Sequence, residues 1–197
     1  LDPFNAQMDN LIQELNRVGG SPRTALPHEP PVAAGDTTAQ AGVQIARMEA
    51  ALKQNPSNLQ VLYQLAMAYV QSQQSDKALI LVDRLLNDPK ADNTSLLFAA
   101  QICHQLNQLP RVEQALGRLT KATPDTPEVW FDLAVVQARQ QKETEAIDSL
   151  RTALEGSARR RAKDSNAPNL YSNALSDPSF NNIRQSPAFQ KLVASSK

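Results

Sequence analysis

The chain has 197 residues, and its 20 basic and 20 acidic residues cancel, which leaves no overall field to attract nucleic acid or anionic lipid. Its single cysteine excludes an internal disulfide and a cysteine-rich zinc cluster. No apolar run reaches the roughly 18–20 residues of a membrane span. We therefore expect one domain with a real core, no nucleic-acid partner and no direct membrane insertion by this chain.

Residues 1–19 have the pattern of an amphipathic helix. Asp2 can be the N-cap, Pro3 is favourable in the first turn, and Gly19 is favourable at the C-terminal end of the helix. An isolated helix of about 16 residues is marginal in water, so this one needs its own array, a second copy in a homodimer, or a foreign partner to lie on. The apolar stripe that would mediate self-association consists of Phe4, Met8, Leu11 and Leu15.

Residues 20–39 form a linker with four prolines among Gly, Thr and Ala. An extended Pro-rich segment of this length reaches roughly 60 Å. Residues 40–58 then read as half a repeat, in which Met48, Ala51 and Leu52 take the places of a second helix. Because prolines occupy the stretch where its first helix would stand, we expect residues 40–54 to be a lone helix that covers the open end of a repeat array.

A 34-residue period runs through residues 59–158, and it gives three repeats over 59–92, 93–126 and 127–158. Within each repeat, apolar residues recur at three- and four-residue steps, which indicates one apolar stripe on each helix. A period of this length marks an array in which no repeat buries its core alone. The residues in register are Ala66, Ala100 and Ala134 at the eighth place, Ala78, Val112 and Ala146 at the twentieth, and Val82, Leu116 and Leu150 at the twenty-fourth.

The repeats resemble the tetratricopeptide repeat (TPR), a helix–turn–helix unit of 34 residues. The resemblance implies an all-α fold, a right-handed α–α superhelix of helix–turn–helix units with capping helices at both ends. The family usually has Gly at the turn between its two helices, where this chain has Gln73, Asn107 and Gln141, and only Asn tolerates a left-handed backbone well. The third repeat fits the family best, at Trp130, Leu133, Ala134, Ala146, Leu150 and Ala153.

Residues 159–197 are expected to form a helical C-terminal cap. Asp177 and Ser186 can each cap a short helix in which Pro comes next and an inward-pointing aromatic residue, Phe180 or Phe189, follows. Such helices would cover the exposed face of the last repeat. The basic cluster at residues 159–163 is interpreted as a solvated surface near a helix C-terminus rather than a site for phosphate or acidic lipid.

The resemblance also implies where a ligand binds, because the first helices of the family line a concave face. Met67 and Leu97 stand where a charged clamp for a peptide carboxylate would be expected, so we predict no such clamp. The apolar, amide-rich face suits an amphipathic helix or an extended apolar peptide, unless the chain's own first helix fills it. The implied peptide-binding residues are Tyr63, Met67, Gln71, Leu97, Gln101, Gln105, Phe131, Val135 and Arg139.

No constellation for catalysis, metal binding or a cofactor is present in the sequence. Two histidines and one cysteine give few options, and phosphate loops, metal-binding His pairs and nucleophile elbows are absent. We expect a non-enzymatic scaffold or adaptor for a protein or peptide partner that the sequence does not identify. One alternative is a structural protein that associates with itself through residues 1–19.

The other alternative is an accessory domain of a larger, membrane-anchored bacterial enzyme or assembly factor. The stretch from Met48 to Pro56 resembles the repeat domains of bacterial cytochrome c maturation proteins. The chain also begins with Leu1 rather than Met. The helix, the Pro-rich linker, the repeat array and the absent first Met together fit a soluble domain, either periplasmic or tethered behind a removed N-terminal anchor, and they leave the compartment open.

Overall fold

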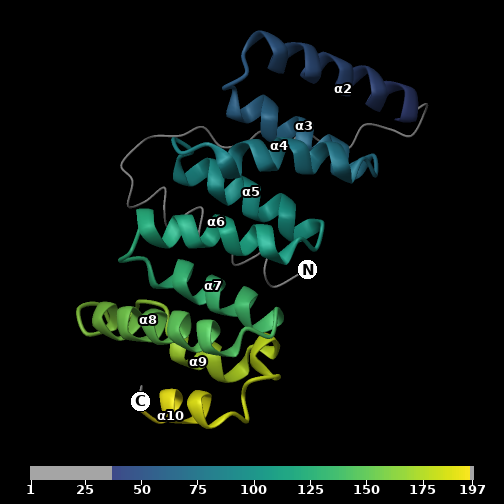
Figure 1. The fold of residues 1–197 in the computed structure, drawn as a ribbon. Coiled ribbons are helices and arrows are strands. Elements are labelled where there is room, and N and C mark those ends of the chain that lie inside the picture. The colour runs from purple at the N-terminus through teal and green to yellow at the C-terminus, as the bar shows by residue number, and fades with distance from the viewer. Residues whose placement is uncertain (1–36, 196–197) are drawn as a thin grey trace. The chain divides into compact units, whose positions relative to one another are not determined.

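The computed structural model describes residues 37–195, and between these limits every regular element is a helix (Figure 1). The predicted all-α repeat fold is therefore confirmed for this part of the chain. The segment with Phe4, Met8, Leu11 and Leu15, and most of the Pro-rich linker, lie outside the described residues. The chain forms two compact bodies, an N-terminal body up to Leu106 and a C-terminal body from Asn107.

The N-terminal body contains the half repeat, the first repeat and the first helix of the second repeat. Each of its helices packs on the next, and α3 also contacts α5. Ala66 and Ala100, the shared eighth places, are fully buried, and their small side chains leave room for α3 and α5 to pack together. The helices are α2 (Thr37–Gln54), α3 (Leu59–Gln71), α4 (Ser75–Asn87) and α5 (Asn93–Gln105).

Side-chain caps set where the first helices of this body begin. The Asn58 Oδ1 atom accepts a hydrogen bond from the Val61 amide at 3.1 Å, and Asp92 Oδ1 accepts one from the Ser95 amide at 2.8 Å. Each bond satisfies one of the amides that the first turn of a helix leaves without a backbone partner. The caps therefore fix the register in which the apolar stripes of α3 and α5 meet the core.

The turn after each first helix has a left-handed residue at the same place of all three repeats. Gln73, Asn107 and Gln141 have φ angles of 59°, 53° and 62°. These are the positions where the family usually has Gly, and the chain keeps the family's backbone geometry with other residues. The left-handed region is unfavourable for a side chain with Cβ, and Asn tolerates it better than Gln does.

The C-terminal body contains the remainder of the repeats and a C-terminal segment. In this body α6 packs on α7, α7 packs along α8, and the segment after residue 176 packs on α7 and α8. A Cβ atom at Gly156 of α8 would lie 2.9 Å from Cγ of Pro127, so only glycine allows this close approach. The elements are α6 (Leu109–Ala122), α7 (Pro127–Arg139), α8 (Glu143–Arg161), α9 (Leu170–Ser176), the 3-10 helix η1 (Pro178–Phe180) and α10 (Pro187–Ser195).

Helix α8 is longer than the repeat pattern predicts. The sequence places the end of the array at residue 158, but α8 continues to Arg161. Arg160 Nη1 lies 2.7 Å from Glu128 Oε1, which ties the last turn of α8 to the first turn of α7. Arg161 Nη1 donates to the Ala167 carbonyl at 3.1 Å. Part of the basic cluster is therefore structural rather than only solvated.

The C-terminal segment follows the predicted capping pattern, with one difference in helix type. Asp177 Oδ1 accepts from the Ser179 amide at 2.8 Å, and Ser186 Oγ accepts from the Phe189 amide at 3.2 Å. These caps turn Phe180 and Phe189 into the core, where both are buried. The first Pro-x-Phe turn is a 3-10 helix rather than an α-helix, and α9 precedes it without having been predicted.

Candidate peptide-binding face

In the N-terminal body, the first helices of two successive repeats carry a stacked aromatic pair. The rings of Tyr63 on α3 and Phe98 on α5 lie 4.3 Å apart between centroids, at an interplanar angle of 26°. The Tyr63 hydroxyl donates a hydrogen bond to Gln101 Oε1 at 3.0 Å. Both rings remain half-buried, so their outer faces are partly accessible. This pair and its amide partner form the most distinctive surface feature of the first helices.

The face formed by α3 and α5 contains no formal charge. Neither helix includes Asp, Glu, Lys or Arg, and His104 of α5 is buried. The helical charges of the first repeat lie on α4 instead, as Asp76, Lys77, Asp83 and Arg84, and its other charges follow α4, at Asp88, Lys90 and the α5 N-cap Asp92. An uncharged face with aromatic and amide groups favours a ligand segment that is apolar or polar without charge.

The structure separates the predicted binding residues of this body into two groups. Met67 and Gln101 are half-buried and Gln71 and Gln105 are exposed, so these four side chains are accessible near Tyr63. Leu97 is buried and belongs to the core. The sequence did not identify Phe98, because its place in the repeat is not a family contact position. The available signal was that Phe98 is the only aromatic residue of α5.

Two of the three predicted binding residues of the third repeat are buried in the core of the C-terminal body. Phe131 is 2 % exposed and Val135 is 3 % exposed, whereas Arg139 is exposed. Asn182 Nδ2 donates a hydrogen bond to the carbonyl of Ala138 at 2.7 Å, which holds the segment after η1 against α7. In this arrangement Phe131 and Val135 are therefore not open to a ligand.

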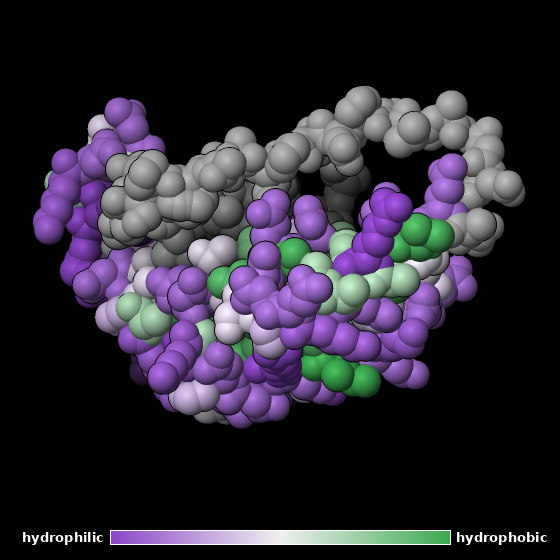
Figure 2. Space-filling view, turned by 90° about the horizontal axis from the view of Figure 1, so that it is seen from above, coloured by the Kyte–Doolittle hydropathy of each residue, from purple (hydrophilic) through white to green (hydrophobic). Residues whose placement is uncertain are grey.

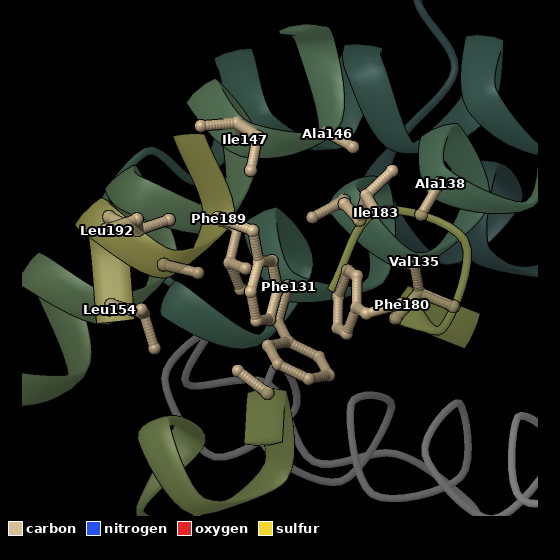
Figure 3. Packing of buried hydrophobic residues seen from close by; sticks show 14 of the residues in the cluster. Phe131, Val135, Ala138, Ala146, Ile147, Leu154, Phe180, Ile183, Phe189 and Leu192 are labelled. Carbon is tan, nitrogen blue, oxygen red and sulfur yellow. The ribbon is translucent and has the colours of Figure 1, made fainter. Parts of the chain in front are cut away.

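Phe131 and Val135 belong to a cluster of buried hydrophobic residues. Figure 3 shows how the side chains of this cluster converge from α7, α8 and the C-terminal segment. The Phe131 and Phe180 rings meet edge to face with centroids 5.7 Å apart, and Phe180 and Phe189 have centroids 5.9 Å apart. Apolar burial of this kind contributes to folding rather than to ligand binding. The first-helix face of the third repeat is filled by the chain itself.

A buried carboxyl lies beside this cluster. Asp132 of α7 is only 3 % exposed. Burial, with smaller contributions from the charges of Glu128 and Asp177, raises the pKa of Asp132 to about 8. A perturbed carboxyl can mark a functional site, but among residues 37–195 no group of three or more His, Cys, Asp or Glu side chains is arranged to hold a metal ion.

The N-terminal body also has an open hollow of about 470 Å³ lined by residues of α2, α3 and α4. The Tyr69 hydroxyl donates a hydrogen bond to Glu49 Oε1 there. Burial first, and then this bond and the charge of Glu49, raise the pKa of Tyr69 to about 12. Lys77 Nζ lies 5.2 Å from the centroid of the Tyr69 ring. The bond to Glu49 joins α2 to α3 and the Lys77 contact joins α4 to α3, and we assign both a structural role.

Comparison with known proteins agrees with this architecture. Family models described as tetratricopeptide repeat match residues 33–95 and 97–166. The chain belongs to the TPR family, whose repeats generally mediate protein–protein interactions. No protein with a curated description matches it. None of the helices in the described part of the chain is long and apolar enough to span a membrane.

Proposed function

We propose that the chain is a non-enzymatic interaction module that binds an uncharged or apolar peptide segment of a partner protein on the α3–α5 face. The observation that carries this proposal is the half-buried Tyr63–Phe98 stack on a face without formal charge. Aromatic side chains on rigid helices supply a large contact area at a small entropic cost, and such residues dominate binding energy at interfaces.

The proposed binding site contains fewer of the residues that the sequence alone implies. They are the accessible residues Tyr63, Met67, Gln71, Gln101 and Gln105, with Phe98 added. The exposed amides can bond to the backbone of an extended segment or to the polar edge of an amphipathic helix. Charges are absent from this face, so affinity should depend little on salt.

The experiment that tests this proposal selects peptides from a random displayed library with the complete chain. The affinity of the selected peptides is then measured for the original chain, for Tyr63→Phe and for Tyr63→Ala. Loss of the ring should weaken binding by about 1–3 kcal/mol, which is roughly 5- to 150-fold. Tyr63→Phe keeps the ring for the stack and removes the hydroxyl that donates to Gln101, so it should weaken binding much less.

Ile80→Ala serves as the matched control, because Ile80 is an apolar residue of α4 that is 67 % exposed and lies outside the α3–α5 face. It should leave peptide affinity unchanged. Equal affinities for Tyr63→Ala and the original chain, with circular dichroism showing both folded, would refute the proposed face. A shared requirement of the selected peptides for a terminal carboxylate would also contradict it, since the face offers no cation.

A further inference from the structure

Helix α2 buries only one of its faces. It packs on α3 through Ile45 and Leu52, which are both buried. Other positions stay open, since Val43 is 52 % exposed and a Cβ atom at Gly42 would meet nothing within 4 Å. Figure 2, which views the molecule of Figure 1 from above, shows scattered green residues on a mostly purple surface. A helix in this position has more apolar surface than α3 covers.

Comparison with the complete repeats identifies which face of α2 lacks its partner. The second helices α4 and α8 lie against their own first helices, α3 and α7. Met48 and Ala51 stand one period, 34 residues, before Val82 and Leu85, yet both are only half-buried. The side chains at these places in the complete repeats are 0–6 % exposed, namely Val82, Leu85, Leu150 and Ala153. What is missing beside Met48 and Ala51 is thus the first helix of their own repeat.

The sequence before α2 contains apolar residues at the spacing that such a helix needs. Between residues 2 and 18 they recur at steps of three, one and three residues, from Met8 to Leu15. The buried residues of α3 have the same steps, from Leu62 to Tyr69. Compared in order, the two sets are Met8, Leu11, Ile12 and Leu15, and Leu62, Leu65, Ala66 and Tyr69.

The length of the linker and the charge of residues 2–18 would also allow this segment to pack on α2. Residues 19–36 can span up to about 56 Å at roughly 3.1 Å per residue, whereas α2 is only about 27 Å long. Residues 2–18 include three acidic residues and one basic residue, and α2 includes Arg47 and Lys53 against Glu49 alone. The two surfaces therefore have opposite net charge, which favours their association.

We propose that residues 2–18 pack in the same chain against Met48 and Ala51 of α2 as the first helix of the half repeat. The array then has four complete repeats, the first of them interrupted by the Pro-rich linker. Its N-terminal end is closed by the chain itself, as the C-terminal end is closed by η1 and α10. The α3–α5 face stays free for a partner, so this proposal and the proposed function can fail independently.

Disulfide formation in the full chain tests the proposal, because the native Cys103 is fully buried. Leu11→Cys is combined in turn with Met48→Cys on α2, with Met67→Cys on the α3–α5 face, and with Ile80→Cys on the outer side of α4. Each double variant is oxidised mildly at low concentration, and its products are identified by mass. We expect an intramolecular Leu11–Met48 disulfide that forms at least about tenfold faster than either control pair, because proximity raises the effective concentration.

Three results would overturn the proposal. Faster reaction with Met67→Cys would show that the segment occupies the α3–α5 face. A disulfide-linked dimer as the main product would show that it lies on a second copy. Equal rates for all three pairs would show that it has no fixed place.

Hydrogen exchange gives a second measurement that does not depend on introduced cysteines. Leu11→Asp combined with Leu15→Asp should remove the contact while leaving α2 in the chain. Exchange of the α2 amides should then become about tenfold faster, and exchange of the α7 amides should not change. Identical exchange of α2 in the original and double-variant chains would count against the proposal.

Discussion

The Phe180 ring meets the Phe131 ring edge to face, with centroids 5.7 Å apart and planes at 81°. This contact joins a 3-10 turn near the end of the chain to the first helix of the third repeat. The last repeat of an array exposes an apolar face that a following repeat would otherwise cover. Here η1 and α10 cover it with Phe180 and Phe189, so the C-terminal segment is part of the core rather than an appendage.

Phe180→Ala should therefore lower the stability of the C-terminal body substantially. Phe180 is fully buried, and removal of a buried Phe ring costs about 3–5 kcal/mol. Denaturant unfolding of the two chains measures the difference. Leu175→Ala is the control, because Leu175 lies on the adjacent helix α9 and is 41 % exposed, so it should cost much less than Phe180→Ala. Similar losses from both variants would mean that the ring contact is unimportant.

The buried carboxyl of Asp132 predicts a stability that depends on pH in an unusual direction. Its folded-state pKa of about 8 lies above the ordinary value of 3.8, so the folded protein holds a proton that the unfolded chain releases between these pH values. The stabilising contribution of this group is complete below pH 3.8 and is lost as the pH rises toward about 8. The free energy of unfolding should thus fall between about pH 4 and pH 8, by at most about 1.4 kcal/mol for each pH unit, because one proton is released.

Asp132→Asn should remove most of this slope, because the amide cannot ionise. Asp148→Asn is the control, since Asp148 is exposed on α8 beside Arg151, and it should leave the slope intact. Glu113 would affect stability only at lower pH, because its pKa is lowered in the folded protein. Although burial raises its pKa, the hydrogen bonds from Lys142 and Gln140 lower it below the ordinary value. An unchanged slope in Asp132→Asn would show that another group causes it.

The sequence predicts what repeats regularly and misses what depends on distant residues. The buried eighth-place Ala residues and the Pro-x-Phe turns were predictable because local spacing and capping determine them. The burial of Phe131 could not be predicted in this way. It depends on a contact with Phe180, which lies 49 positions later in the chain. Helix α8 likewise extends beyond residue 158, where the ion pair between Arg160 and Glu128 stabilises its last turn. Family positions identify a face, and only the tertiary structure shows whether that face is open.

The two glycines inside α6 and α8 should respond in opposite ways to the same substitution. A Cβ atom at Gly117 would meet nothing within 4 Å, so Gly117→Ala should stabilise α6 by about 0.5–1 kcal/mol through helix propensity. At Gly156 the Cβ atom would lie 2.9 Å from Cγ of the Pro127 ring, which cannot rotate away. Gly156→Ala should thus cost about 1–3 kcal/mol, in spite of the same gain in propensity.

Denaturant midpoints of the two alanine variants measure this contrast, and each variant serves as the control for the other. Equal stabilisation by both would show that α7 and α8 shift apart at no cost. Such a result would mean that the close approach of Pro127 to Gly156 does not constrain the third repeat.

The left-handed turn residues predict a graded gain from glycine. Gln141 has a φ of 62°, and its neighbours hold it there, because Gln140 Nε2 and Lys142 Nζ donate to Glu113 Oε2 at 2.9 and 2.6 Å. Such surroundings maintain a conformation that costs a non-glycine residue about 1–2 kcal/mol. Gln141→Gly should relieve most of this cost and stabilise the C-terminal body by about 0.5–1 kcal/mol, after the greater chain entropy of glycine is subtracted.

Asn107→Gly should stabilise less than Gln141→Gly, because Asn already tolerates the left-handed region and its φ is similar, at 53°. Thermal and denaturant unfolding of both variants in the full chain give the comparison. If the gain arises from relief of strain, it should follow the residue that is replaced rather than the repeat in which it lies. Gln73→Gly, with a φ of 59° in the first repeat, should then match Gln141→Gly. A larger gain at Asn107 than at either Gln would show that local packing outweighs backbone strain at these turns.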